Sequence, residues 1–218
     1  MRATQTGFTL IELLIVIGII GVLAAALLPQ LMSGQDAANA LADQRNLSTH
    51  YTWMLDYKRK HNQTLPAEGG YKFVMATWTS QIYDHTQENF DRFWTPGPAR
   101  SNDPAYLDLL KQMQRDPKLV WPDLASTTSS DTHYCGRSKL HFKTRESSAD
   151  EAWMADDNEG GWNLRDGTIN VLFNGGNVRT YSFQVLKELH ALPDFNIDAP
   201  IPTFGPDSPI EPCRRLDN

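Results

Sequence analysis

The feature that most constrains this chain is an apolar run near its N-terminus, from Phe8 to Leu28. The run covers 21 residues, and a helix of that length spans about 30 Å, the thickness of one hydrocarbon core. It is longer than the apolar region of a conventional secretion signal. We therefore expect a single helix that crosses a membrane once.

Glu12 is the one charged residue inside this run. A carboxylate within a bilayer costs a few kcal/mol, so it needs a partner or a purpose. If the chain is cut between Gly7 and Phe8, the new α-amine of Phe8 supplies a positive charge one helical turn away. The same carboxylate could instead meet the amine of a neighbouring copy, which would make assembly depend on register. The residues leave both partners open.

The sequence Gly-Phe-Thr-Leu-Ile-Glu-Leu at 7–13 follows a short leader that contains Arg2. It resembles the class III signal of type IV pilins and type II secretion pseudopilins, and the resemblance extends to about Gln30. It implies that a prepilin peptidase/methyltransferase cuts after Gly7 and methylates the amine of Phe8.

The same resemblance assigns further roles. Glu12 would be the assembly glutamate of the family, and Pro29 falls where many pilins carry a proline that softens the helix. The implied partners are the inner membrane and other pilin or pseudopilin subunits. The part of the chain after the membrane helix would lie outside the cytoplasm.

Two simpler interpretations of the N-terminus remain. A conventional secretion signal could be cleaved at the small residues Ala24–Ala26, but it would not need Glu12. An unprocessed single-span anchor fits the length, but it leaves the charge at Glu12 unexplained.

Charge separates the membrane run from the rest of the chain. Arg2 and Glu12 are the only charged residues before Ser33, and the whole chain has a net charge of -6. The acidic excess therefore lies entirely after Ser33. An acidic domain of this kind offers no basic face, so we expect no nucleic-acid partner.

The chain has two cysteines, Cys135 and Cys213. In an oxidising compartment they could form one disulfide, which would close a loop of about 80 residues and stabilise the fold by about 4 kcal/mol in the chain-entropy model. The alternative is two thiols, and both states remain open.

After Pro29 the pattern becomes that of an amphipathic helix, which we expect to end at about Lys60. Its expected buried stripe consists of Ala37, Leu41, Leu47, Tyr51, Met54 and Leu55. Its expected solvent face consists of Asp36, Asp43, Arg45 and Asp56. Lys58–Lys60 suit a helix C-terminus, and Asn62 and Pro66 should end the element.

The middle of the chain is less regular. Residues 71–79 are apolar and rich in β-forming side chains, so they predict a strand. Asp103 and Pro104 predict the N-cap and first position of a short helix. Residues 126–130 predict a loop. The large aromatic residues before the turn at 96–98 should pack against the long helix: Phe90, Phe93 and Trp94.

The C-terminal third has the clearest β signal. Residues 168–173 and 178–183 flank an Asn-Gly-Gly-Asn connection, which predicts a hairpin. Residues 139–144 predict a neighbouring strand, and 183–192 a short helix. From about residue 193 the chain is rich in proline and should be extended.

The hairpin also resembles, more weakly, the signature of a pilin-like family common in planctomycetes. That signature is a histidine, nine residues, then Asp-Gly, around an Asn-Val-Leu-Phe core that residues 170–173 match. Arg165 stands in place of the histidine and Gly175 in place of the aspartate.

Other candidate sites have weak support. His133, Cys135 and His141 are close in sequence, but no second cysteine pair accompanies them. Residues 156–161 are rich in oxygen donors but lack the spacing of a calcium loop, so a solvated turn is the simpler interpretation. We therefore expect no metal and no cofactor.

The sequence thus predicts an α+β chain with a cleaved leader at 1–7, a membrane and assembly helix at 8–30, and a pilin-like domain at 31–218. That domain would hold a small antiparallel sheet packed on the amphipathic part of the helix. The expected function is that of a filament subunit, not an enzyme. The alternative is a membrane-tethered enzyme or binding module with the same export signal.

Overall fold

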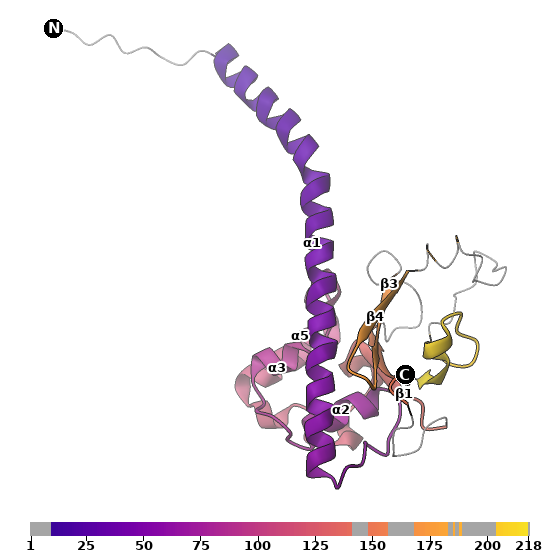
Figure 1. Ribbon diagram of the computed structural model, residues 1–218. Coiled ribbons are helices and arrows are strands. Elements are labelled where there is room, and N and C mark those ends of the chain that lie inside the picture. The colour runs from indigo at the N-terminus through magenta and orange to yellow at the C-terminus, as the bar shows by residue number, and fades with distance from the viewer. Residues whose placement is uncertain are drawn as a thin grey trace. The chain divides into compact units, whose positions relative to one another are not determined.

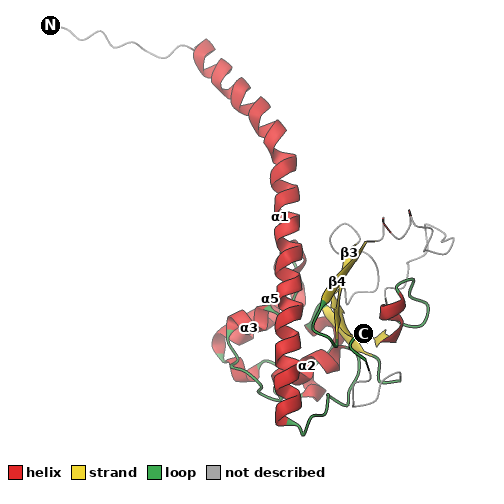
Figure 2. Cartoon of the chain, viewed as in Figure 1, coloured by secondary structure: helices red, strands yellow, loops and turns green. Residues whose placement is uncertain are grey.

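The computed structural model describes residues 10–140, 148–156, 168–182, 185, 188 and 204–217 (Figure 1). The chain divides into two compact units, Met1–Ala38 and Asn39–Asn218. The division falls inside helix α1. We call the second unit the head. Helices and an antiparallel sheet are segregated along the head (Figure 2), so the predicted α+β class is confirmed.

Helix α1 is assigned from Leu10 to Lys60, 51 residues, and the assignment continues through Pro29. The bend expected at that proline stays a prediction. The helix ends as the sequence indicates, with three basic residues in its last turn. Asn62 and Gln63 then adopt φ values of 53° and 61°, and the Gln63 amide donates to the Lys58 carbonyl at 2.7 Å.

Within the head, the predicted apolar stripe of α1 is confirmed in part. Leu47 and Met54 are fully buried, whereas Leu41 remains 50% exposed. The prediction for the opposite face is wrong at Asp43, which is fully buried. The sheet and the helical segments contact α1 from different directions, so a single apolar stripe does not describe its buried surface.

Four short helices follow α1: α2 (Tyr71–Thr79), α3 (Gln87–Asp91), α4 (Pro98–Ser101) and α5 (Pro104–Arg115). The strand predicted at 71–79 is wrong, because this segment is α2. Its residues from Phe73 to Trp78 are all buried. A short segment buried on every side has no polar face, so hydrophobic periodicity does not distinguish a helix from a strand there.

The predicted cap of α5 is confirmed. Asp103 accepts a hydrogen bond from the Tyr106 amide at 2.9 Å, and Pro104 occupies the first helical position. The loop predicted at 126–130 contains parts of two single-turn 3-10 helices, η2 (Leu124–Ser126) and η3 (Ser129–Asp131). Another such helix, η1 (Pro117–Leu119), follows α5.

The head contains a five-stranded antiparallel sheet of order β4-β3-β2-β1-β5. Its strands are β1 (Tyr134–Arg137), β2 (Ala152–Asp156), β3 (Thr168–Phe173), β4 (Val178–Ser182) and β5 (Leu216–Asp217). The predicted hairpin is confirmed as β3 and β4. Gly176 has a φ of 83°, which suits glycine in a tight turn, and its amide donates to the Phe173 carbonyl at 2.8 Å.

Alternate side chains of the sheet belong to two apolar clusters, as expected for strands that are buried on both faces. The larger cluster contains Tyr134, Trp153 and Leu172 together with residues of α1 and α2. The smaller contains Cys135, Val171 and Phe173, and helix η4 (Glu211–Arg215) covers it. The C-terminal segment therefore closes the face that α1 does not contact (Figure 1).

Some sequence predictions fall on residues that the structure does not describe. Lys139 and Leu140 lie in a turn, and the rest of the strand predicted at 139–144 lies outside the described residues. The same holds for most of the helix predicted at 183–192 and for much of the tail from residue 193. The leader at 1–7 and the predicted domain limits stay predictions.

Candidate functional site

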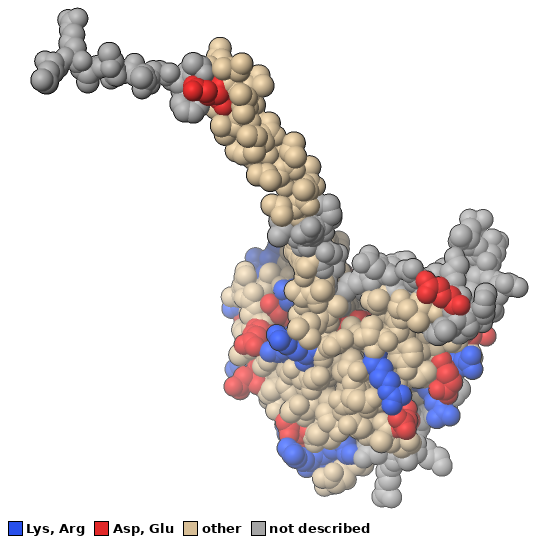
Figure 3. Space-filling model, turned by 45° about the horizontal axis from the view of Figure 1, so that its top comes forward, with Lys and Arg blue, Asp and Glu red and all other residues tan. Residues whose placement is uncertain are grey.

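The N-terminal unit presents an apolar surface with no cover inside the described chain. Leu10–Leu27 is long and apolar enough to cross a membrane, and none of it is buried. Leu10 and Val22 are 87% and 72% exposed. The unit carries one acidic side chain near its beginning (Figure 3). Such a helix is stable only in lipid or against other apolar helices.

Glu12 lies in the first turn of α1. Backbone amides at a helix N-terminus carry partial positive charge, so this position favours a carboxylate even before any partner is considered. Gly7 and Phe8 lie outside the described residues, and their roles in cleavage and methylation stay predictions. Of the predicted N-terminal site residues, the described part of the unit therefore contains Glu12 and Pro29.

The structure thus places Glu12 in the first turn of an exposed apolar helix, as the N-terminal sequence predicts. Residues 2–28 match the family model of the prokaryotic N-terminal methylation motif. The chain carries a prepilin-type signal. Prepilin peptidase and pilin-type assembly act on signals of this kind. No curated protein and no solved structure matches the chain, so the weaker resemblance of residues 170–173 stays a prediction.

The prepilin-type signal is joined, through α1, to a head that holds the helix by buried polar contacts. Asp43 is the centre of these contacts. One of its carboxylate oxygens accepts from the Tyr134 hydroxyl at 2.6 Å, and the other accepts from the Asn170 side-chain amide at 2.7 Å. All three residues are 0–1% exposed. Buried hydrogen bonds to a charged acceptor are among the stronger ones in proteins.

Asn170 extends this network through the sheet. Its side-chain amide also donates to Asp156 at 3.0 Å, and its backbone amide donates to the same carboxylate at 2.7 Å. The side-chain oxygen of Asn170 (Oδ1) accepts from the Thr180 hydroxyl at 2.5 Å, and the side-chain amide of Gln44 donates to that hydroxyl at 3.0 Å. Helix α1 is thus tied to three strands through one asparagine.

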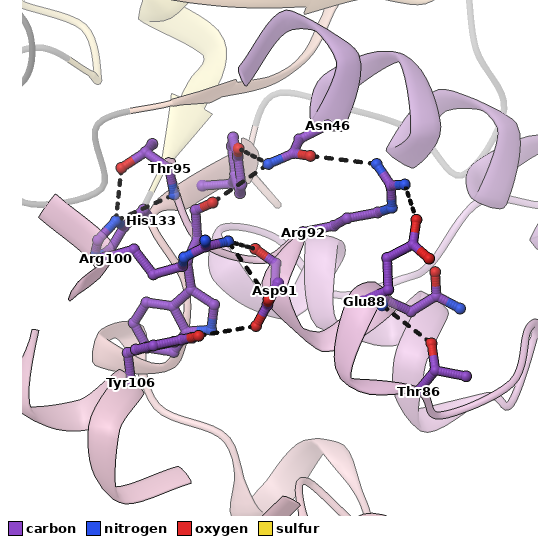
Figure 4. Close-up of polar contacts among 12 residues, drawn as sticks. Asn46, Thr86, Glu88, Asp91, Arg92, Thr95, Arg100, Tyr106 and His133 are labelled. Atoms are coloured by element: carbon purple, nitrogen blue, oxygen red, sulfur yellow. Dashed lines mark hydrogen bonds and ion pairs between the residues drawn. The ribbon is translucent and has the colours of Figure 1, made fainter. Parts of the chain in front are cut away.

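A second set of contacts holds α1 from the side of α3 (Figure 4). Asn46 donates to the Trp94 carbonyl at 3.3 Å and accepts from Arg92 at 3.4 Å. Arg92 also pairs with Glu88 at 2.7 Å. The predicted packing of the aromatic residues on the long helix is confirmed for Phe93, whose ring lies 5.9 Å from that of Trp53 between centroids.

Thr95, His133 and Asp103 form a hydrogen-bonded series like that of a hydrolase triad, and Figure 4 shows the contacts between Thr95 and His133. The Thr95 hydroxyl lies 2.8 Å from Nδ1 of His133, and Nε2 lies 3.1 Å from the Asp103 carboxylate. The Thr95 amide can only donate, and it points to Nδ1 at 3.3 Å, so in neutral His133 the proton is on Nε2. Thr95 is 0% exposed and His133 4%. A substrate has no access to the hydroxyl, so these contacts fasten the start of α5.

The other candidate ligands do not come together as a site. Within the described ranges no group of three or more His, Cys, Asp or Glu side chains could hold a metal. His141 lies outside those ranges. Asp156, which begins the oxygen-rich stretch, is 3% exposed and accepts from Asn170. The rest of that stretch is not described.

Cys135 and Cys213 are fully buried and belong to the same small apolar cluster. They are present as thiols in this structure. Their placement in one cluster brings the two cysteines to the same face of the sheet. The predicted disulfide stays a prediction, which non-reducing peptide mapping of the exported protein can test.

Two buried charged features could not be predicted from the sequence. Asp43 lies on the polar side of a helical wheel, so its sequence position predicts a surface residue. Arg137 and Glu151 form an ion pair at 2.6 Å with 2% and 6% of their side chains exposed. Arg137 ends β1 and Glu151 precedes β2, and each alone looks like a surface charge, so their pairing becomes visible only in the folded chain.

Burial lowers the pKa of His50 from 6.5 to about 4, with the nearby positive charge of Arg92 acting in the same direction. Its Nε2 lies 2.9 Å from the Arg92 carbonyl and donates to it. In the unfolded chain the His50 side chain is therefore protonated below about pH 6.5, whereas in the folded head it becomes protonated only near pH 4.

We expect this difference to reduce the free energy of unfolding as the pH falls from 6.5 towards 4. The loss from His50 alone should reach about 2 kcal/mol at pH 5. Denaturant titration of the detergent-solubilised protein, followed by tryptophan fluorescence at pH 7 and pH 5, measures it. His50→Gln retains a donor for the carbonyl but does not titrate, so it should lose about 2 kcal/mol less over the same interval. Equal losses in both proteins would contradict the assignment.

Proposed function

We propose that this protein is a structural subunit of a type IV pilus-like or type II secretion pseudopilus filament. It is made as a membrane-anchored precursor, cleaved after Gly7 and methylated on Phe8. The observation that carries this proposal is the methylation motif at 2–28, which coincides with an uncovered apolar helix segment. A membrane holds this segment before assembly, and neighbouring copies cover it afterwards.

Glu12 gives the assembly its register in this proposal. Cleavage creates a positive amine on Phe8, and an apolar bundle leaves that amine few partners. The carboxylate of Glu12 in a neighbouring copy neutralises it when the two helices are correctly offset. A misaligned pair would bury two uncompensated charges, which is strongly unfavourable.

The head takes the extracytoplasmic side in this proposal and has no enzymatic role. Support comes from the way α1 is held from residue 43 onward, by side chains of the sheet on one side and of the α3 region on the other. The alternative of a tethered enzyme would need an accessible catalytic group. Its best candidate, the series from Thr95 to Asp103, is buried and fastens the start of α5.

Processing tests the first step of this proposal. In cells with an active prepilin peptidase, intact-mass analysis of membrane-extracted protein should show loss of residues 1–7 and one added methyl group on Phe8. In cells that lack the peptidase, a precursor that retains residues 1–7 and an unmethylated Phe8 should accumulate in the membrane. A mature chain that begins after Ala26 would instead indicate a conventional secretion signal.

A further inference from the structure

The head contains a cavity of about 870 Å³ that none of the features above uses. Two segments form its walls: residues 79–85, which begin at the last residue of α2, and residues 116–122, which follow α5. This volume lies within the range of sites that bind drug-sized ligands and exceeds what a single side chain fills.

Both walls are fixed to one buried tryptophan. Trp78 stacks on His85 with ring centroids 4.0 Å apart, and its indole nitrogen donates to the Val120 carbonyl at 3.0 Å. Tyr83, on the first wall, stacks on Trp53 of α1 at 3.8 Å. The cavity is therefore preformed and does not depend on a loop closing over it.

Backbone strain is concentrated in the same walls. Among the described residues, four other than glycine have positive φ, and two of them end α1. The other two, Gln81 and Trp121, each have a φ of 49° and lie on opposite walls. Trp121 is bulky and precedes Pro122, and both properties disfavour this conformation. Strain of this kind persists where the surrounding structure holds a functional shape.

Each wall carries one acidic side chain. The Asp84 carboxylate makes no hydrogen bond or ion pair within the described chain, whereas Asp116, on the other wall, accepts from the Lys118 amide at 3.0 Å through one of its carboxylate oxygens. His85 uses Nε2 to donate to the Trp78 carbonyl at 3.1 Å, which leaves Nδ1 as an acceptor in the neutral ring. Lys118 is the one cation among the lining residues.

We propose that this cavity binds a basic peptide segment of a partner protein, in which an arginine or lysine lies beside an apolar residue. The carboxylates of Asp84 and Asp116 receive the cation, and Ile82 and Pro122, the accessible apolar residues of the two walls, contact the apolar side chain. The net charge of -6 on the whole chain attracts such a segment and repels an acidic one. The proposal is independent of filament formation.

The test uses the full chain in detergent micelles and two fluorescein-labelled pentapeptides, Gly-Arg-Phe-Lys-Gly and its acidic twin Gly-Glu-Phe-Glu-Gly. Fluorescence anisotropy should show saturable binding of the basic peptide and none of the acidic one. Asp84→Lys should weaken binding at least about tenfold, whereas Lys118→Glu should strengthen it several-fold. A gain of affinity does not arise from misfolding, so the second variant separates recognition from damage.

Asp108→Lys is the matched control, because Asp108 is an exposed residue of α5 outside the cavity and the substitution changes the net charge equally. It should leave binding unchanged. Equal weakening by Asp84→Lys and Asp108→Lys would reduce the effect to overall charge and overturn the proposal. Absence of saturable binding, or equal affinity for the acidic peptide, would also overturn it.

Discussion

Glu12→Ala should leave a protein that inserts and is cleaved normally but does not assemble. Alanine is small and apolar, so the membrane helix should enter the bilayer at least as well as before. Cleavage depends on the leader and Gly7, which are unchanged. In the polymer, the Phe8 amine loses the carboxylate that neutralises it. An uncompensated buried charge costs roughly 3–5 kcal/mol, so the assembly constant should fall by about 10²- to 10³-fold or more.

The measurement is the yield of filaments or cross-linked oligomers relative to the pool of cleaved monomer in the membrane. Glu12→Asp should be intermediate, because the charge stays but its reach is one methylene shorter. Val16→Ala, an apolar change on the same exposed helix, is the control and should assemble. If Glu12→Ala is cleaved and assembles as well as the unaltered protein, the carboxylate does not set the register.

Asp43→Ala should destabilise the head by about 3–5 kcal/mol. The substitution removes the acceptor for two buried donors, the Tyr134 hydroxyl and the Asn170 amide, and each unsatisfied group costs about 1–3 kcal/mol. It also leaves an unfilled volume between α1 and the sheet. Asp43→Asn retains the shape of the side chain but places an amide against the Asn170 amide. It should therefore lower the free energy of unfolding measurably, but by less than Asp43→Ala does.

Denaturant titration with tryptophan fluorescence measures this loss, because the large apolar cluster beside Asp43 contains Trp53, Trp94 and Trp153. Asp56→Ala provides the control on the same helix. Asp56 is paired only at the surface, with Arg59 at 2.6 Å, so its removal should change stability by less than about 0.5 kcal/mol. An Asp43→Ala protein as stable as the Asp56→Ala protein would show that the buried network does not hold α1.

Local chemistry made several features predictable from the sequence. The basic last turn of α1, the Asp103 cap and the Asn-Gly-Gly-Asn hairpin each depend on residues close together in the chain. The same is true of the N-terminal signal, whose residues lie within one short stretch. Patterns of this kind need no knowledge of distant contacts.

Other features depend on distant contacts and escaped prediction. Residues 71–79 form a helix because the core surrounds them, although their composition favours a strand. Asp43 is buried because Tyr134 and Asn170, which come more than 90 residues later, supply its donors. The cavity walls come from two segments about 30 residues apart and depend on the backbone of Trp121. None of these three features produces a periodic pattern of apolar residues in the sequence.

The most direct test of the filament role is the composition of filaments from the native cell. Filaments sheared from the surface, or pseudopili isolated from the envelope, should contain this chain, and intact-mass analysis should find it beginning at N-methylated Phe8. The membrane of the same cells should hold a pool of the same mature chain. Filaments that lack the chain while mature protein accumulates in the membrane would contradict the account.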